Sequence, residues 1–143
     1  MNFFLCKLAM PYFEHLSKHP TSLLARIYGI YTIKITGTCK VNIMLMAHTM
    51  QIARPEKVQR VFDLKGSTVD RKVRVAQDST GLKTLKDENF IRLHQKAGKD
   101  GLLQMFESER AFVQQQLKLD AAFLRNNNIM DYSLLLCIEE RQA

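Results

Sequence analysis

Apolar residues recur at helical spacing near the start of the chain, where Phe4, Leu8 and Tyr12 fall on one face. This period predicts an amphipathic helix over residues 2–19. The helix is expected to break or restart near Pro11, because proline cannot donate the hydrogen bond that a helix interior requires. We expect its apolar face to pack against a sheet.

A strand-like pattern replaces the helical one in the next part of the chain. Residues 26–35 alternate between apolar and polar positions, and residues 41–47 are apolar enough for a strand that is buried on both faces. The turn sequence Thr36-Gly37-Thr38 between them predicts an antiparallel hairpin. Residues 59–64 form the next expected strand, and a Gly-Ser-Thr turn at 66–68 follows it.

Helical spacing returns after a polar loop at residues 74–84. We expect a short helix over residues 86–96, with Asp87 and Glu88 in its first turn, where the helix dipole favours acidic side chains. A longer helix follows a glycine-containing break and ends at residues 126–128. Its core face is expected to consist of Leu103, Phe106, Val113, Leu117, Ala121 and Leu124.

These segments predict an α+β fold in which an antiparallel sheet packs against helices. The chain has 143 residues, of which 46% are hydrophobic and 24% are charged, so one domain with a real core is expected and general disorder is excluded. The longest aliphatic run extends from Ile43 to Ala47, far short of the roughly 20 residues that a membrane-spanning helix needs.

The net charge of +7 is unevenly distributed. Residues 54–74, which we call the basic segment, hold seven basic residues against three acidic ones. Such a segment attracts anions, and charge alone does not separate an acidic membrane surface from nucleic acid. Nucleic acid is the less favoured partner, because the basic segment lacks a recognisable binding module and interleaved stacking aromatics.

Cysteine and histidine positions argue against disulfide and metal chemistry. The three cysteines, Cys6, Cys39 and Cys137, are odd in number, far apart and without a CxxC pair, a pattern typical of reduced intracellular proteins. His15 and His19 lie four residues apart on the expected helix, but no acidic or cysteine cluster accompanies them. We therefore interpret both histidines as solvated helix residues.

The first candidate site lies at the exit of the strand over residues 59–64. Asp63 and Lys65 are two residues apart, so they should emerge on the same side of the strand. A lysine beside a carboxylate stabilises both charged forms, and Gly66 would let an anion such as phosphate approach the backbone. The alternative is an ordinary surface ion pair, worth about 0–1 kcal/mol.

The second candidate site is Asp131, which is embedded in the apolar run 129–136. Burying an unpaired carboxylate is costly, so we expect Asp131 to have a partner, a metal ion or solvent access through a cleft. The alternative is a capping aspartate that accepts hydrogen bonds from backbone N–H groups.

Both candidate sites carry a family resemblance. Asp63-Leu-Lys-Gly-Ser67 with Arg71, and the segment 129–135, Ile-Met-Asp-Tyr-Ser-Leu-Leu, closely resemble the two signature motifs of the phosphatidylinositol phosphate kinases. Further matches follow in the family's order, at residues 12–16, 26–29 and 84–87. The resemblance implies that residues 1–143 are the central portion of a catalytic domain with a protein-kinase-like, two-lobed fold, present in part.

The resemblance also implies roles for individual residues. The reaction would be phosphoryl transfer from ATP, with Mg²⁺, to the inositol ring of a membrane phosphoinositide. Asp131 would accept or orient the proton of the inositol hydroxyl. Lys65 and Arg71 would bind substrate phosphate, and Asp63 would orient Lys65 and keep it charged. The basic segment would face anionic lipid, which places the protein in the cytoplasm, at the inner face of membranes.

The resemblance implies a nucleotide site that is incomplete within this chain. In the family, a glycine-rich loop and a lysine that hold ATP come before this region, and an Ile-Ile-Asp magnesium motif and a lipid-selecting loop come after it. Many members carry two asparagines at the hinge, where this sequence has Ala47 and His48, so Met46, Ala47 and His48 are the candidate nucleotide contacts. We expect no metal ligands in this chain.

Two hypotheses follow from these observations. The chain is part of a phosphatidylinositol phosphate kinase, or it is a catalytically inactive module that keeps Lys65 and Arg71 and docks on anionic phosphoinositide membranes.

Overall fold

The computed structural model describes residues 7–37, 39–50, 52, 55–74 and 82–139 of the chain. The chain divides into two compact units. Unit 1 comprises Met1–Thr49 and Glu107–Met130, and unit 2 comprises Met50–Phe106 and Asp131–Ala143. Helices and strands occur in both units, which confirms the α+β fold class.

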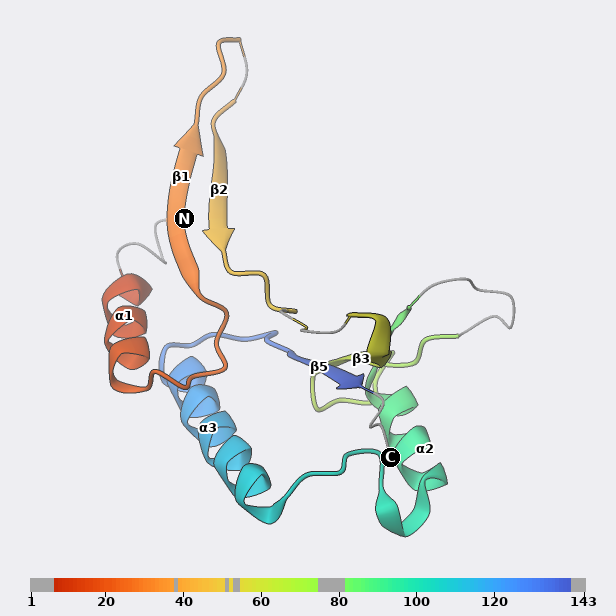
Figure 1. Cartoon of the computed structure of the whole chain (residues 1–143). Coiled ribbons are helices and arrows are strands. Elements are labelled where there is room, and N and C mark those ends of the chain that lie inside the picture. Colours follow the sequence, from red (N-terminus) through yellow and green to blue (C-terminus); the bar gives the residue numbers. More distant parts are fainter. Residues whose placement is uncertain (1–6, 38, 51, 53–54, 75–81, 140–143) are drawn as a thin grey trace. The chain divides into compact units, whose positions relative to one another are not determined.

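Unit 1 contains α1 (Ala9–Lys18), β1 (Ile27–Ile33), β2 (Val41–Met46) and α3 (Glu107–Asn126). The two strands form the predicted antiparallel hairpin, visible as the two long arrows in Figure 1. Its register pairs residue 27 with residue 46 and residue 33 with residue 41. The helix expected over residues 2–19 is described from Ala9, and residues 1–6 lie outside the described part of the chain.

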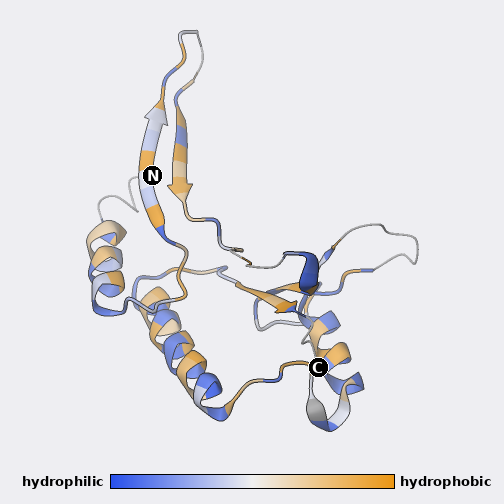
Figure 2. Cartoon of the chain, viewed as in Figure 1, coloured by the Kyte–Doolittle hydropathy of each residue, from blue (hydrophilic) through white to orange (hydrophobic). Residues whose placement is uncertain are grey.

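Burial of β2 on both faces was a wrong prediction. Every residue of β2 is exposed, and Figure 2 shows hydrophobic colouring along this strand. A strand is buried on both faces only when a layer covers each face of its sheet. In the described part of the chain, the sheet of β2 has β1 as its only other strand.

A buried carboxylate holds α1, the following turn and α3 together. Asp120 accepts hydrogen bonds from the His15 Nε2, at 2.7 Å, from the Ser22 hydroxyl, at 2.8 Å, and from the Leu23 backbone N–H, at 2.7 Å. The His15 ring also stacks on Phe123, with ring centroids 4.4 Å apart. The prediction that His15 is a solvated residue was therefore wrong. Its partners come from distant parts of the chain, which helical spacing alone does not reveal.

The buried face of α3 is more polar than expected. Its buried residues are Gln116, Asp120 and Phe123. Two residues of the predicted core face, Leu103 and Phe106, precede the first helical residue and do not belong to the helix. Hydrogen bonding to Asp120 explains how this face can be polar and buried at once.

A left-handed residue ends α3. Asn128 has φ 56° and donates its N–H to the Arg125 carbonyl, and Ile129 donates to the Leu124 carbonyl at 2.9 Å. This pair of bonds is the Schellman pattern of helix ends, in which asparagine is one of the few residues that tolerate the left-handed conformation. The asparagine run thus ends the helix, as the sequence predicts.

Unit 2 is built on a sheet with strand order β4-β3-β5. Its central strand β3 (Val58–Leu64) pairs antiparallel with β5 (Leu134–Glu139) and parallel with the short β4 (Thr84–Leu85). The sheet is therefore mixed, whereas a purely antiparallel sheet was expected. The helix α2 (Asp87–Lys96) and short 3-10 helices at Pro55–Lys57 and Gly98–Asp100 complete the elements of this unit.

The core of unit 2 is centred on β3. Val61 and Phe62 are 2% and 0% exposed, and the Phe62 ring meets the edge of Phe90 on α2, with centroids 5.3 Å apart. This contact fixes the start of α2 near the end of β3. Among the described helices, none has the length and apolar content needed to span a membrane.

Candidate functional site

Strand pairing brings the two sequence motifs together. Residue 63 of β3 is the partner of residue 135 of β5, and residue 64 is the partner of residue 134. The segment that contains Asp131 leads directly into β5, so it must lie beside the end of β3, where Lys65 follows. The convergence of the motifs is thus a consequence of sheet register.

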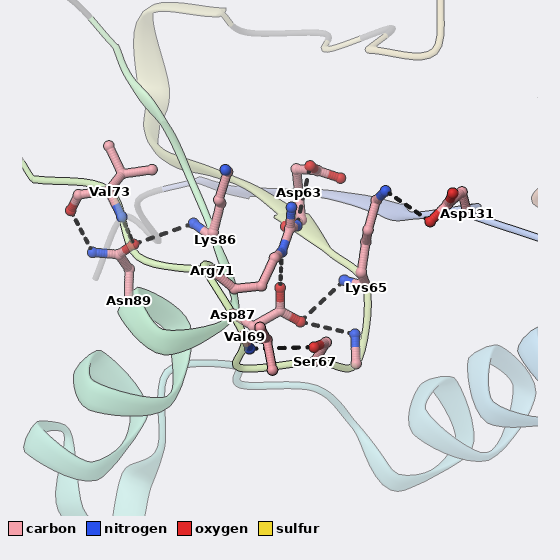
Figure 3. A network of polar contacts seen from close by, with 11 residues as sticks. Asp63, Lys65, Ser67, Val69, Arg71, Val73, Lys86, Asp87, Asn89 and Asp131 are labelled. Atoms are coloured by element: carbon pink, nitrogen blue, oxygen red, sulfur yellow. Dashed lines mark hydrogen bonds and ion pairs between the residues drawn. The ribbon is translucent and has the colours of Figure 1, made fainter.

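Lys65 and Asp131 form an ion pair, with 3.5 Å between the lysine Nζ and the Asp131 Oδ1 (Figure 3). The Asp131 side chain is 92% exposed, so the expectation of a carboxylate in an apolar setting was wrong, while a partner and solvent access were correctly anticipated. Asp131 has φ 59°, a left-handed conformation that is costly for most residues and that clusters at functional sites. Exposed pairs of this kind contribute at most about 1 kcal/mol.

Asp63 has a different partner from the one expected. Its carboxylate accepts a hydrogen bond from the Arg71 Nη2 at 3.1 Å, whereas Lys65 contacts Asp131. The hydrogen bond from the Ser133 hydroxyl makes the largest contribution to the lowered pKa of Asp63. Burial, the next largest effect, acts on this pKa in the opposite direction and is outweighed by Ser133 together with Arg71 and the nearby charge of Lys65. Asp63 is therefore ionised at neutral pH and connects β3 to the segment that carries Asp131.

Arg71 is an internal part of this network. Its side chain is 11% exposed, and besides the Asp63 carboxylate it donates to the Asp63 carbonyl and, through Nε at 2.8 Å, to Asp87. Hydrogen bonds and charge from the two carboxylates raise the pKa of Arg71, with Asp87 the larger contributor. The described contacts of Arg71 are thus with protein groups, and its binding to substrate phosphate stays a prediction.

Asp87 was not identified from the sequence as a site residue. One oxygen of its buried carboxylate accepts the backbone N–H groups of Lys65, at 3.0 Å, and Gly66, at 2.8 Å, and the other accepts Arg71. Burial alone would raise the pKa of Asp87, but these hydrogen bonds outweigh burial and lower the pKa. The sequence showed only an acidic residue in a first helical turn, because its partners lie 16 to 22 residues away.

The loop that follows β3, residues 65–74, is attached to α2 at further points along its length. The Asn89 side chain accepts the Val73 N–H at 2.8 Å and donates to the Val73 carbonyl at 3.0 Å, and Glu88 donates its N–H to the Arg71 carbonyl at 3.0 Å. The described loop residues therefore follow a path that is fixed by the N-terminus of α2.

Three of the acidic side chains of unit 2, those of Asp63, Asp87 and Asp131, are paired with cations of the protein. The described residues contain no group of three or more His, Cys, Asp or Glu side chains that could hold a metal ion. Binding of Mg²⁺ stays a prediction from the family resemblance.

The hinge candidates belong to unit 1. Met46 pairs with Ile27 in the hairpin, and the Ala47 N–H donates to the Arg26 carbonyl at 2.7 Å, so that N–H is engaged within the protein. His48 is exposed. Nucleotide contact by Met46, Ala47 and His48 stays a prediction.

Comparison with known proteins gives a consistent result. The family model described as phosphatidylinositol-4-phosphate 5-kinase matches residues 2–143. The chain is 34% identical over 130 residues to the mouse phosphatidylinositol 4-phosphate 5-kinase-like protein 1, covering 90% of this chain and 30% of that protein. It is 34% identical over 137 residues to the chicken phosphatidylinositol 4-phosphate 5-kinase type-1 beta, covering 94% and 24%.

A relative from a third organism gives a similar match. The phosphatidylinositol 4-phosphate 5-kinase of Plasmodium falciparum is 32% identical over 139 residues, covering 95% of this chain and 8% of that protein. The chain thus spans less than a third of the length of these relatives. Since the family model matches nearly every residue, including both motifs, the chain belongs to the phosphatidylinositol-4-phosphate 5-kinase family.

Proposed function

We propose that the chain provides the acceptor side of a phosphoinositide kinase site, which transfers the γ-phosphoryl group of ATP to an inositol hydroxyl of a phosphatidylinositol phosphate. The observation that carries the proposal is the 3.5 Å contact between Lys65 and Asp131, which are 66 residues apart in sequence. Family membership supports the reaction class.

Asp131 is the group that accepts or orients the proton of the attacking hydroxyl. A general base must reach the proton it abstracts, and the Asp131 carboxylate is 92% exposed, so a lipid headgroup can approach it. Phosphoryl transfer passes through a loose transition state in which positioning and charge stabilisation supply most of the catalysis. A fixed carboxylate beside a lysine meets both needs.

Lys65 is the cation that binds the phosphate already present on the inositol ring. Its side chain is 34% exposed, so the ammonium can contact a ligand while it remains next to Asp131. A lysine acts on phosphate as a point charge and needs no fixed fork geometry. Asp63 and Arg71 contact each other and support the site, and we propose Arg71 as a second phosphate-binding cation.

The membrane contact is assigned to exposed cations of the basic segment. Lys72 and Arg74 are exposed and follow Arg71 in the same loop. Each basic residue near an anionic lipid surface contributes about 1 kcal/mol of binding free energy. This arrangement supports peripheral binding to the inner face of a membrane, with the phosphoinositide as substrate.

The test uses a chimera in which residues 2–143 of this chain replace the matched segment of the chicken type-1 beta kinase. We expect transfer of radiolabelled phosphate from ATP to phosphatidylinositol 4-phosphate vesicles, and a loss of at least about 100-fold with Asp131→Asn, the lower end of general acid–base contributions. Asp70→Asn is the matched control, because Asp70 is also exposed and left-handed, with φ 53°, in the same unit. Full transfer by the Asp131→Asn chimera would refute the role of Asp131.

A second candidate is a non-catalytic module that binds phosphoinositide membranes. The exposed side chains of Lys72 and Arg74 favour it, because they can contact anionic lipid without any chemical step. It gains support if the folded chimera transfers no phosphate while the chain itself sediments with phosphoinositide vesicles in a Lys65-dependent manner.

A further inference from the structure

We propose that Asp87 is the positioning residue that holds Lys65 against Asp131, an inference that rests on the proposed function and adds a residue to its site. Asp87 belongs to α2, its side chain is 8% exposed, and its three described protein contacts outside its own helix are with Lys65, Gly66 and Arg71. These contacts reach Lys65 through its backbone.

The geometry of the carboxylate fixes the direction in which Lys65 leaves the strand. One oxygen accepts two consecutive N–H groups, those of Lys65 and Gly66, at 3.0 and 2.8 Å. Two consecutive N–H groups point to one acceptor only in a tight turn, and Gly66 allows this turn with φ 71°. The backbone at Lys65 is thereby held in place, and its side chain begins from a fixed point.

Arg71 closes the other end of the loop on the same carboxylate. It contacts the second oxygen of Asp87 at 2.8 Å and also contacts both the carbonyl and the carboxylate of Asp63. The residues that follow β3, Lys65 and Gly66, and Arg71 further along the chain are therefore joined to one buried carboxylate. Charge-assisted hydrogen bonds of this type are the stronger class of hydrogen bond in proteins.

The ion pair between Lys65 and Asp131 is too weak to keep Lys65 in position by itself. The Asp131 side chain is 92% exposed, and exposed ion pairs are among the weakest contacts in proteins. The three hydrogen bonds to buried Asp87 are the stronger constraint. The position of Lys65 therefore depends on Asp87 more than on Asp131.

The experiment measures the contact directly, without ATP. A carbodiimide forms a zero-length amide cross-link between an amine and a carboxylate that are in contact, and mass spectrometry quantifies the Lys65–Asp131 product in the whole chain. We expect this yield to fall about tenfold in Asp87→Asn, the change expected when one hydrogen bond to a charged group is lost. Asp87→Glu, which keeps the charge, should restore part of the yield.

Asp120→Asn is the matched control. Asp120 is buried to a similar extent, with 4% of the whole residue exposed against 6% for Asp87. It also accepts hydrogen bonds from backbone and side-chain donors, but it belongs to unit 1. A merely destabilising loss of a buried aspartate would lower the cross-link yield in both variants. We expect the yield of Asp120→Asn to match that of the wild type.

Gly66→Ala tests the same geometry if Asp87→Asn does not fold. An added Cβ meets nothing within 4 Å at Gly66, so the substitution acts through the left-handed turn, and Gly37→Ala in the unit 1 hairpin, with φ 84° and equally open space, is its control. Gly66→Ala should lower the cross-link yield and Gly37→Ala should not.

Unchanged cross-linking in Asp87→Asn would overturn the positioning role. If Asp87→Asn does not fold, unchanged cross-linking in Gly66→Ala would do the same. The measurement is independent of catalysis, so it separates a failure of this inference from a failure of the proposed function. In the active chimera, Asp87→Asn should lower kcat while the KM for ATP is unchanged. A raised KM for ATP with an unchanged kcat would count against the inference.

Discussion

Three aspartates of the described residues, Asp63, Asp87 and Asp120, each accept several hydrogen bonds and each have a lowered pKa. Hydrogen bonds from Ser133 and then Arg71 lower the pKa of Asp63. For Asp87 and Asp120, burial acts in the opposite direction, but hydrogen bonds led by Arg71 and by His15, respectively, outweigh it. All three groups therefore favour the folded state in their ionised form.

The stability of the chain should consequently depend on acid pH. A group with a lowered folded-state pKa contributes stability that is fully present above its unfolded pKa, here 3.8, and is lost as the pH falls through the folded-state pKa. We expect the free energy of unfolding, measured by urea denaturation, to be constant from pH 7 to about pH 5 and to fall below about pH 4. Asp120→Asn should reduce this pH dependence, and a variant with the full wild-type slope would argue against the role of Asp120.

Residue chemistry was only partly predictable from the sequence. Asp63, Lys65 and Asp131 stood out because charged residues at a strand exit or within an apolar run are locally unusual. Asp87 and Asp120 occupy ordinary helical positions, and their importance comes from partners about 16 to 105 residues away. Local periodicity contains no information on such partners.

At the level of elements, β1, β2, β3 and the short helix α2 were predicted to within a few residues, whereas β4 and β5 were not predicted as strands. Period and turn chemistry identify β1, β2, β3 and α2 because these signals are local. The pairing of β3 with β5 was not predicted, since the apolar run after Asp131 was recognised for its acidic residue and not as a strand. This pairing is what joins the two motifs.

The end of α3 allows a test at the same level, because it precedes the segment of Asp131. Asn128 is left-handed, with φ 56°. Asn128→Gly should maintain or raise the urea midpoint, since glycine adopts this conformation freely, whereas Asn128→Val should lower stability by about 1–2 kcal/mol. Asn126→Val, at the last residue of the helix, is the control and should have little effect, because valine and asparagine have similar helix propensities. Equal effects of the two valine substitutions would exclude a special role for the left-handed position.

At the level of the whole molecule, the family assignment rests on a match across residues 2–143, and the site rests on contacts within unit 2. Asp63, Lys65, Arg71, Asp87 and Asp131 all belong to that unit. The hinge candidates Met46, Ala47 and His48 belong to unit 1. The two-lobed arrangement and the nucleotide contacts stay predictions from the family resemblance.

The central claim is that Lys65 and Asp131 act as one catalytic unit. The most direct measurement is a double-mutant cycle on phosphoryl transfer in the chimera, with Lys65→Ala, Asp131→Asn and the double variant. Residues that act as a unit have strongly non-additive effects, so the double variant should lose about as much kcat/KM as the more severe single variant. Losses that multiply in the double variant would show that the two residues act independently and would contradict the account.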